Sequence, residues 1–167
     1  MPNSLATLLF FFAITFLASA SGAIFKPDTW YADLKKPLWT PPNWLFPIVW
    51  MILFSAMAIA SWLVWESSDA PAVVEIGLYT VHLFINATWS FFFFGRKRLD
   101  LAMVNVVALW VIVAVLIFVF APINQLAAVL LVPYLAWVTL AAALNMRLLM
   151  INGARGDLNA NHIRQQA

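Results

Sequence analysis

Five long apolar stretches, separated by short polar segments, set the pattern of the chain. Each stretch is continuous and about twenty residues long, which is the length that an α-helix needs to cross roughly 30 Å of hydrocarbon. Strands of a transmembrane barrel would instead alternate apolar and polar residues over about ten positions. The pattern therefore predicts an all-α, integral membrane bundle of five transmembrane helices. They cover residues 5–25, 44–65, 73–94, 99–121 and 125–150.

The connection at residues 26–43 is the longest and holds four prolines. Because each proline ring fixes φ and restricts the residue before it, this segment should be stiff, and we expect a shaped lid rather than a slack linker. Pro133 lies inside the fifth stretch and should bend or locally open that helix without ending it. A transmembrane domain over residues 1–151 then leaves a polar cytoplasmic tail at 152–167.

The first stretch has an alternative interpretation as a cleaved signal peptide, because Ala18-Ser19-Ala20 resembles a cleavage site. No Lys or Arg precedes the stretch, however, and its apolar run is longer than that of a typical signal peptide. The sequence favours a retained transmembrane helix.

Composition supports the membrane assignment. Hydrophobic residues make up 65% of the 167 residues and charged residues only 10%, whereas soluble domains carry about 25% charged residues. Most of the surface must therefore face the lipid bilayer. Cysteine is absent, which excludes a disulfide framework, a thiolate metal site and a cysteine nucleophile.

The basic residues are distributed asymmetrically. Five crossings place the loop 26–43, the turn 95–98 and the tail on one side of the membrane, and all nine Lys and Arg residues fall there. The positive-inside rule then predicts a cytoplasmic C-terminus and an N-terminus outside. Without a soluble basic domain, nucleic acid is not an expected partner. The nine residues are Lys26, Lys35, Lys36, Arg96, Lys97, Arg98, Arg147, Arg155 and Arg164.

Three of the predicted helices carry stripes of aromatic and amide side chains at steps of three and four residues, which places each stripe on one helix face. Three such faces could enclose a cavity lined by flat rings and a few hydrogen-bonding groups, as pockets for large apolar ligands are. The alternative is that Asn and Ser pack helices together. The stripes are Pro47, Trp50, Phe54 and Ser61; Tyr79, His82, Asn86, Trp89 and Ser90; and Tyr134, Trp137, Ala141 and Asn145.

The tryptophans divide into two groups. Those near helix ends or on unpatterned faces fit an interfacial belt or lipid-facing positions, whereas those deep on the stripes fit a pocket. We assign Trp44, Trp62, Trp65 and Trp110 to the first group and Trp50, Trp89 and Trp137 to the second.

His82 is the one histidine within a predicted membrane span. It could ligate haem, or it could be a neutral histidine hydrogen-bonded to a neighbouring helix. No second histidine lies in a predicted span, and the sequence has no C-x-x-C-H attachment site, so we favour the neutral, hydrogen-bonded histidine.

Three blocks of the sequence together are similar to a known family. The first runs from Gly22-Ala23-Ile24-Phe25-Lys26-Pro27 through Trp30-Tyr31 and Leu34-Lys35-Lys36-Pro37-Leu38-Trp39-Thr40-Pro41-Pro42-Asn43-Trp44-Leu45-Phe46-Pro47 to Trp50. The second comprises Asn86, Trp89 and Phe93-Phe94-Gly95, and the third comprises Pro133-Tyr134-Leu135-Ala136-Trp137 and Leu144-Asn145. The chain resembles the TspO/MBR family, the tryptophan-rich sensory proteins of bacteria and the mitochondrial translocator protein (peripheral benzodiazepine receptor).

The resemblance implies a five-helix bundle, usually a homodimer, that needs no cofactor and binds porphyrins such as protoporphyrin IX and isoquinoline or benzodiazepine-type ligands. It also implies a membrane of bacterial type or origin, with the proline-rich loop as a lid over the pocket. Carried onto this chain, the pocket consists of Trp30, Tyr31, Trp39, Pro41, Trp50, Phe54, Asn86, Trp89, Trp137, Ala141 and Asn145.

Two positions depart from the family pattern. Phe91 stands where many members have proline, so the third transmembrane helix should be straighter. The segment Leu144–Arg147 lacks the aromatic residue of the cholesterol motif of animal members, so cholesterol binding does not carry over.

Three functions remain open on the sequence alone. The leading one is a sensory or transport-type receptor that stacks a porphyrin on tryptophans and pairs its propionates with Lys26, Lys35 or Lys36. A light-dependent, porphyrin-degrading enzyme is the second, although no acid pair, nucleophile–base pair or metal-ligand cluster is recognisable. The third is a dimeric scaffold joined through the small residues Ala18 and Gly22.

Overall fold

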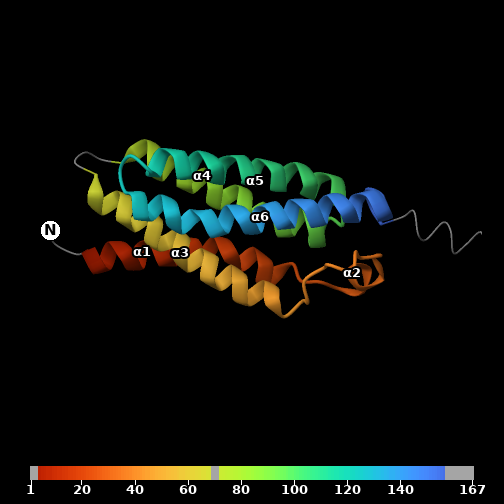
Figure 1. Ribbon diagram of the computed structural model, residues 1–167. Helices are drawn as coiled ribbons and strands as arrows, with labels where there is room; N and C mark the ends of the chain where they lie inside the picture. The colour runs from red at the N-terminus through yellow and green to blue at the C-terminus, as the bar shows by residue number, and fades with distance from the viewer. Residues whose placement is uncertain (1–3, 69–71, 157–167) are drawn as a thin grey trace, which may run out of the picture.

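The computed structural model describes residues 4–68 and 72–156, and these residues form helices and connecting loops without a strand. The predicted all-α bundle is confirmed, with five helices long and apolar enough to cross a membrane. A short helix, α2, lies within the predicted lid at one end of the bundle (Figure 1). The elements are α1 (Ser4–Ile24), α2 (Thr29–Asp33), α3 (Leu45–Ser67), α4 (Val73–Ser90), η1 (Phe91–Gly95), α5 (Leu99–Phe120) and α6 (Gln125–Asn152).

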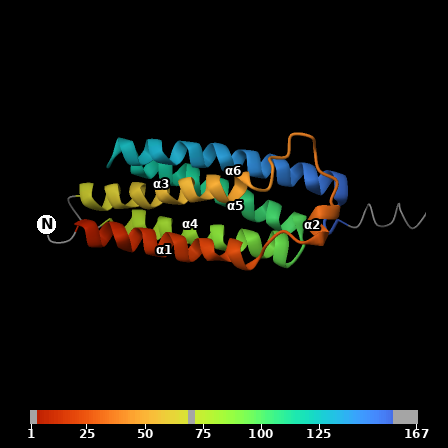
Figure 2. The same ribbon diagram turned by 90° about the horizontal axis from the view of Figure 1, so that it is seen from below.

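The five long helices pack as a closed ring. Helix α1 contacts α3 and α4, α3 contacts α6, α6 contacts α5, and α5 contacts α4. The ring order is therefore α1, α3, α6, α5, α4, as the two perpendicular views allow the reader to follow (Figure 2). Every long helix has two neighbours in the ring, and α3 and α4 also contact each other across it. Each helix thus turns part of its surface inward and leaves the rest for lipid.

Helix α6 runs the whole length of the bundle. Asn124 caps its first turn by accepting from the backbone N–H of Ala127 at 3.1 Å, and its Nδ2 donates to Ser67 Oγ at 2.9 Å. The helix continues through Pro133 to Asn152, as transmembrane helices can when neighbouring helices support them. The proline therefore does not end the helix, as predicted.

The third transmembrane helix, α4, ends in a feature that the sequence analysis did not predict. At Phe91 the α-helix gives way to a π turn, in which the N–H of Arg96 donates to the carbonyl of Phe91 at 2.7 Å. Such turns carry one extra residue and often occur at functional sites. Here the wide turn accommodates crowded rings: a Cβ on Gly95 would lie only 2.8 Å from the ring of Phe25.

The half of the bundle farther from α2 is closely packed, and buried hydrogen bonds join its helices. The hydroxyl of Tyr134 lies 2.8 Å from both Asn86 Nδ2 and His82 Nε2, and the hydroxyls of Thr15 and Tyr79 form a hydrogen bond with each other. Because no water competes within hydrocarbon, these bonds satisfy groups that would otherwise be costly to bury. They tie α1 and α6 to α4.

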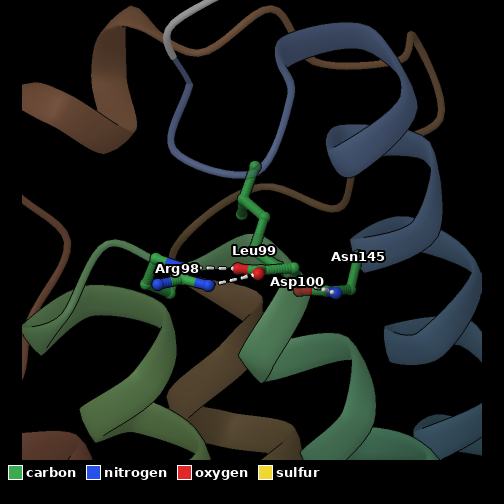
Figure 3. Close-up of polar contacts among 4 residues, drawn as sticks. All are labelled: Arg98, Leu99, Asp100 and Asn145. Atoms are coloured by element: carbon green, nitrogen blue, oxygen red, sulfur yellow. Dashed lines mark hydrogen bonds and ion pairs between the residues drawn. The ribbon is translucent and has the colours of Figure 1, made fainter.

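The basic residues of the described chain lie in segments at one end of the bundle. These segments are the loop 26–43, the turn 96–98, and the C-terminal end of α6 with the residues that follow it to 156 (Figure 1). Arg98 is held by Asp100, whose carboxylate accepts from the guanidinium Nε at 2.7 Å (Figure 3). The one-sided charge predicted from sequence is therefore present, and Arg164 and most of the predicted tail lie outside the described residues.

Replacing Tyr134 with phenylalanine should lower stability by about 1–2 kcal/mol, because it leaves His82 and Asn86 without their shared partner. Thermal unfolding in detergent measures the change. Thr80→Val is the control, since the Thr80 hydroxyl bonds only the carbonyl of Ile76 in its own helix. Equal stability of the two variants would contradict the interhelical role of Tyr134.

Candidate functional site: an aromatic cavity beneath the α2 loop

The half of the bundle nearer α2 encloses a cavity of about 690 Å³. All five long helices contribute to its wall, and the loop between α1 and α3 covers one end. The volume lies within the range of about 300–1,000 Å³ that is usual for small-molecule sites. Eight of the eleven predicted pocket residues line it: Tyr31, Trp50, Phe54, Asn86, Trp89, Trp137, Ala141 and Asn145.

Two stacked ring pairs form much of the aromatic wall. On α3, Trp50 stacks on Phe54 with centroids 5.1 Å apart and planes at 27°. On α4 and η1, Trp89 stacks on Phe93 at 4.9 Å and 30°. Phe93, in the π turn, follows Trp89 by four residues, and both residues line the cavity.

Helix α6 supplies the third aromatic side of the cavity. The indole of Trp137 meets the ring of Phe46 edge to face at 5.6 Å. Ala141 lies one turn further along the same helix and lines the cavity too. Because alanine is small, this part of the α6 surface leaves room beside Trp137.

Three polar atoms in the cavity-lining residues are buried without a partner in the described part of the chain: the indole Nε1 of Trp89 and of Trp137, and Oδ1 of Asn145. Asn145 Nδ2 is in use, since it donates to the carbonyl of Leu99 at 2.9 Å (Figure 3). Unpaired buried polar groups in native structures call for water or a ligand. Each of these three atoms is itself buried, so the residues of the wall hold two donors and one acceptor that no described group satisfies.

Lys26 is the one charged residue among those that line the cavity. Lys36 instead forms hydrogen bonds within the loop, where its ammonium donates to the carbonyls of Ala32 and Leu34 at 3.0 and 3.2 Å. Burial lowers the pKa of Lys36 and raises that of Tyr31. The cavity thus has a cationic rim at Lys26 and a neutral aromatic interior.

The other three predicted pocket residues lie outside the main cavity. Trp30 donates from Nε1 to the carbonyl of Arg155 at 3.1 Å and packs against Phe93. Trp39 is 49% exposed on the loop. Pro41 lines a small second hollow that shares Trp137 and Ala141 with the main one. These residues therefore shape the loop that covers the cavity rather than the cavity wall.

The predicted stripes extend beyond the cavity. Four of their residues do not line it but lie, fully or almost fully buried, in the packed half of the bundle: Ser61, Tyr79, His82 and Tyr134. A stripe shows which face of a helix points inward. It does not show where along the helix that face packs against neighbours and where it borders a cavity.

Sequence analysis missed the contribution of α1. Ser19, Gly22 and Ala23 line the cavity, and a Cβ on Gly22 would lie 3.7 Å from Ser90 Oγ of α4. The run of small residues at the end of α1 was the available signal, and we had attributed it to dimerisation. Other cavity residues that we did not predict are Phe16, Phe25, Phe46, Phe93, Val106 and Leu109.

The predicted tryptophan groups are largely confirmed by exposure. Trp44, Trp65 and Trp110 are 65%, 44% and 39% exposed, as expected for residues facing lipid or the interface. Trp62 differs: it is half-buried and donates to the carbonyl of Ser4 at 3.2 Å. That bond links α3 to the start of α1.

Comparison with known proteins agrees with this architecture. The family model described as TspO/MBR family matches residues 7–151. The chain belongs to the TspO/MBR family. It is 39% identical to the protein CrtK of Rhodobacter capsulatus, across 89% of this chain and 94% of the relative, and 36% identical to a tryptophan-rich sensory protein of Cereibacter sphaeroides, across 88% and 95%. It is also 40% identical to the human translocator protein, across 70% of each chain.

The structure distinguishes the two interpretations of His82. Asn86 Nδ2 donates to the Tyr134 oxygen, and His82 Nε2 forms a hydrogen bond of 2.8 Å with the same hydroxyl group. The imidazole is completely buried and does not line the cavity. Within the described residues no group of three or more His, Cys, Asp or Glu is placed to hold a metal ion. A neutral, structural histidine fits these facts.

If this member of the TspO/MBR family takes up haem, His82→Ala should leave the Soret band of the bound haem unchanged, because the imidazole is engaged with Tyr134 outside the cavity. Absorption spectra of the purified protein with added haem test this. A Soret shift in the wild type that disappears in His82→Ala would identify His82 as an iron ligand and overturn the structural assignment.

Proposed function

We propose that this protein is a membrane receptor of sensory or transport type that binds porphyrins, such as protoporphyrin IX, and isoquinoline or benzodiazepine-type ligands in the aromatic cavity. The observation that carries the proposal is a cavity of about 690 Å³ inside a membrane bundle with three tryptophans in its wall. A cavity of this size fits a ligand much larger than a lipid-soluble gas or a metal ion.

The arrangement of rings favours a flat, apolar ligand. Trp50 with Phe54, Trp89 with Phe93, and Trp137 belong to three different helices, so a planar macrocycle can meet ring faces or edges on several sides. Offset and edge-to-face aromatic contacts contribute about 0.5–1.5 kcal/mol each beyond area burial. A porphyrin offers four linked aromatic rings for such contacts.

The polar groups suit the acidic edge of a porphyrin. Lys26 at the rim can pair with a propionate, whereas Lys35 and Lys36 do not line the cavity. Being exposed, Lys26 should contribute modestly, as surface ion pairs do. The indole N–H groups of Trp89 and Trp137 are buried without a partner in the described part of the chain, and they can donate to a ligand if its binding uncovers them.

Relatives support the receptor class by name only: one is called a tryptophan-rich sensory protein and others are called translocator proteins. For this chain we infer a bacterial membrane, an N-terminus outside, and a cytoplasmic end formed by the loop, the turn 96–98 and the end of α6. A homodimer is part of the same proposal.

Protoporphyrin IX should quench the intrinsic fluorescence of the wild type saturably, and an isoquinoline ligand should reverse the quenching. Trp137→Phe should weaken binding about threefold to tenfold, because it removes part of the ring surface and an N–H donor from the wall. Titration in detergent measures both effects. Trp65→Phe is the matched control, since Trp65 is exposed and does not line the cavity.

Linear quenching that the competitor does not reverse would show that the porphyrin partitions into the micelle. That result would contradict the proposal for this cavity. Equal weakening by the two substitutions would place the ligand elsewhere on the protein.

The second candidate is a light-dependent enzyme that degrades bound porphyrin, which is favoured by three indoles in one cavity wall. A photosensitiser bound in this cavity would lie beside these indoles, which could then act as its redox partners. If this is the function, bleaching of the porphyrin under illumination should slow in Trp50→Phe and Trp137→Phe proteins saturated with ligand. Bleaching at the wild-type rate in both variants would argue against it.

A further inference from the structure

Asn152, the last residue of α6, joins that helix to the loop over the cavity. It is completely buried, and its side-chain amide binds both backbone groups of Lys35. The N–H of Lys35 donates to Oδ1 at 2.9 Å, and Nδ2 donates to the carbonyl of Lys35 at 3.0 Å. Two bonds from one planar amide fix the orientation as well as the position of this loop backbone.

The residues that follow Asn152 extend the same junction. The carbonyl of Arg155 accepts from Trp30 Nε1 at 3.1 Å. Gly156 has a φ of 74°, and a Cβ at this position would lie 2.8 Å from Leu34 Cδ2 and 3.1 Å from Trp30 Nε1. Residues 152–156 therefore hold the loop at Trp30, Leu34 and Lys35. We call this five-residue segment the clasp.

The clasp also reaches α5. The carbonyl of Ala154 accepts from the N–H of Leu99 at 2.9 Å. Leu99 is completely buried, and its own carbonyl accepts from Asn145, a cavity residue (Figure 3). The loop is thereby tied, through the clasp, to the two helices that form one side of the cavity.

The clasped loop carries part of the cavity wall. Lys26, Pro27, Tyr31 and Asn43 line the cavity, and Tyr31 is only 5% exposed, with its ring 5.5 Å from that of Phe94. Moving the loop away would remove these residues from the cavity together. The position of the loop thus determines whether this end of the cavity is covered.

The other polar tether of the loop is exposed. Asp28 caps α2 and pairs with Lys97 at 2.7 Å, but both side chains are more than 40% exposed. The ion pair lowers the pKa of Asp28, so the pair persists at neutral pH and is lost as pH falls through that lowered pKa. Solvent and salt screen such exposed pairs. The buried amide of Asn152 is therefore the stronger hold on the loop.

We propose that the clasp keeps the loop closed over the cavity, and that Asn152 is a positioning residue for the bound ligand although it does not line the cavity. The inference about ligand release rests on the proposed function, whereas the inference that the clasp holds the loop does not. Opening the clasp releases the loop, uncovers Tyr31 and Lys26 together, and lets the ligand leave faster.

A purely structural role for Asn152 makes a different prediction. Its Nδ2 also donates to the carbonyl of Leu148, which finishes the last turn of α6. If that were its whole role, Asn152→Ala would lower stability without changing the loop. The matched control is Asn124→Ala, which removes the cap at the opposite end of the same helix together with a link to Ser67 of α3.

The experiment uses two readouts on the full-length protein in lipid nanodiscs. The chain has no cysteine, so Leu38→Cys, at a fully exposed loop position, gives a unique site for a spin label whose mobility reports the loop without any ligand. The second readout is the dissociation rate of protoporphyrin IX into empty lipid vesicles, followed by recovery of tryptophan fluorescence.

Asn152→Ala should mobilise the label at position 38 and speed dissociation of protoporphyrin IX about tenfold, which is the effect of losing two hydrogen bonds of ordinary strength. Asn124→Ala should leave both readouts at wild-type values while lowering the unfolding temperature. Gly156→Ala strains the clasp against Leu34 and leaves Asn152 unchanged, so it should change both readouts in the same direction as Asn152→Ala. It replaces Asn152→Ala in the experiment if that variant does not fold.

An immobile label and an unchanged dissociation rate in Asn152→Ala would overturn the proposal, as would equal effects of Asn124→Ala. A mobilised label with no saturable porphyrin binding even in the wild type would leave the clasp standing and reject the proposed ligand. The two failures are thus distinguishable.

Discussion

Closure of the helix ring is the constraint on which the rest of the structure depends. In hydrocarbon there is little hydrophobic force between helices, so close packing and interhelical hydrogen bonds must hold them. In the half far from α2, these are the bonds of Tyr134 with His82 and Asn86 and that of Thr15 with Tyr79. With this half fixed, the other half can remain hollow. Asn86 belongs to both: it bonds Tyr134 and lines the cavity.

The hollow half is closed by contacts at the end of the bundle nearer α2. Phe93, in the π turn, packs against Trp89 and Tyr31, and the clasp secures the loop that carries Tyr31. A rigid bundle with a secured cover can be preorganised for a bulky ligand, which reduces the entropy lost on binding. On our proposal, exchange of the ligand depends on this cover, which a few hydrogen bonds hold in place.

Sequence patterns predicted the spans and the aromatic and amide residues of the cavity wall on three helices, because both follow from helix periodicity and hydrophobic length. Trp50, Asn86 and Trp137 could be placed on inward faces by spacing alone. The patterns could not predict that the Trp30 indole donates to the carbonyl of Arg155, because this hydrogen bond joins residues 125 positions apart. The π turn was missed because it depends on ring crowding around Phe25 and Gly95. The role of Gly22 in the wall was missed because small residues in membrane helices have several uses.

The most direct test of the central claim is to fill the cavity without disturbing the fold. Ala141 lines the cavity, whereas Ala143, two residues further along α6, is exposed. Ala141→Phe should abolish saturable, competed quenching by protoporphyrin IX while Ala143→Phe retains it, both variants having near-native thermal stability. Undiminished binding in Ala141→Phe would show that the porphyrin does not occupy this cavity, and would contradict the account.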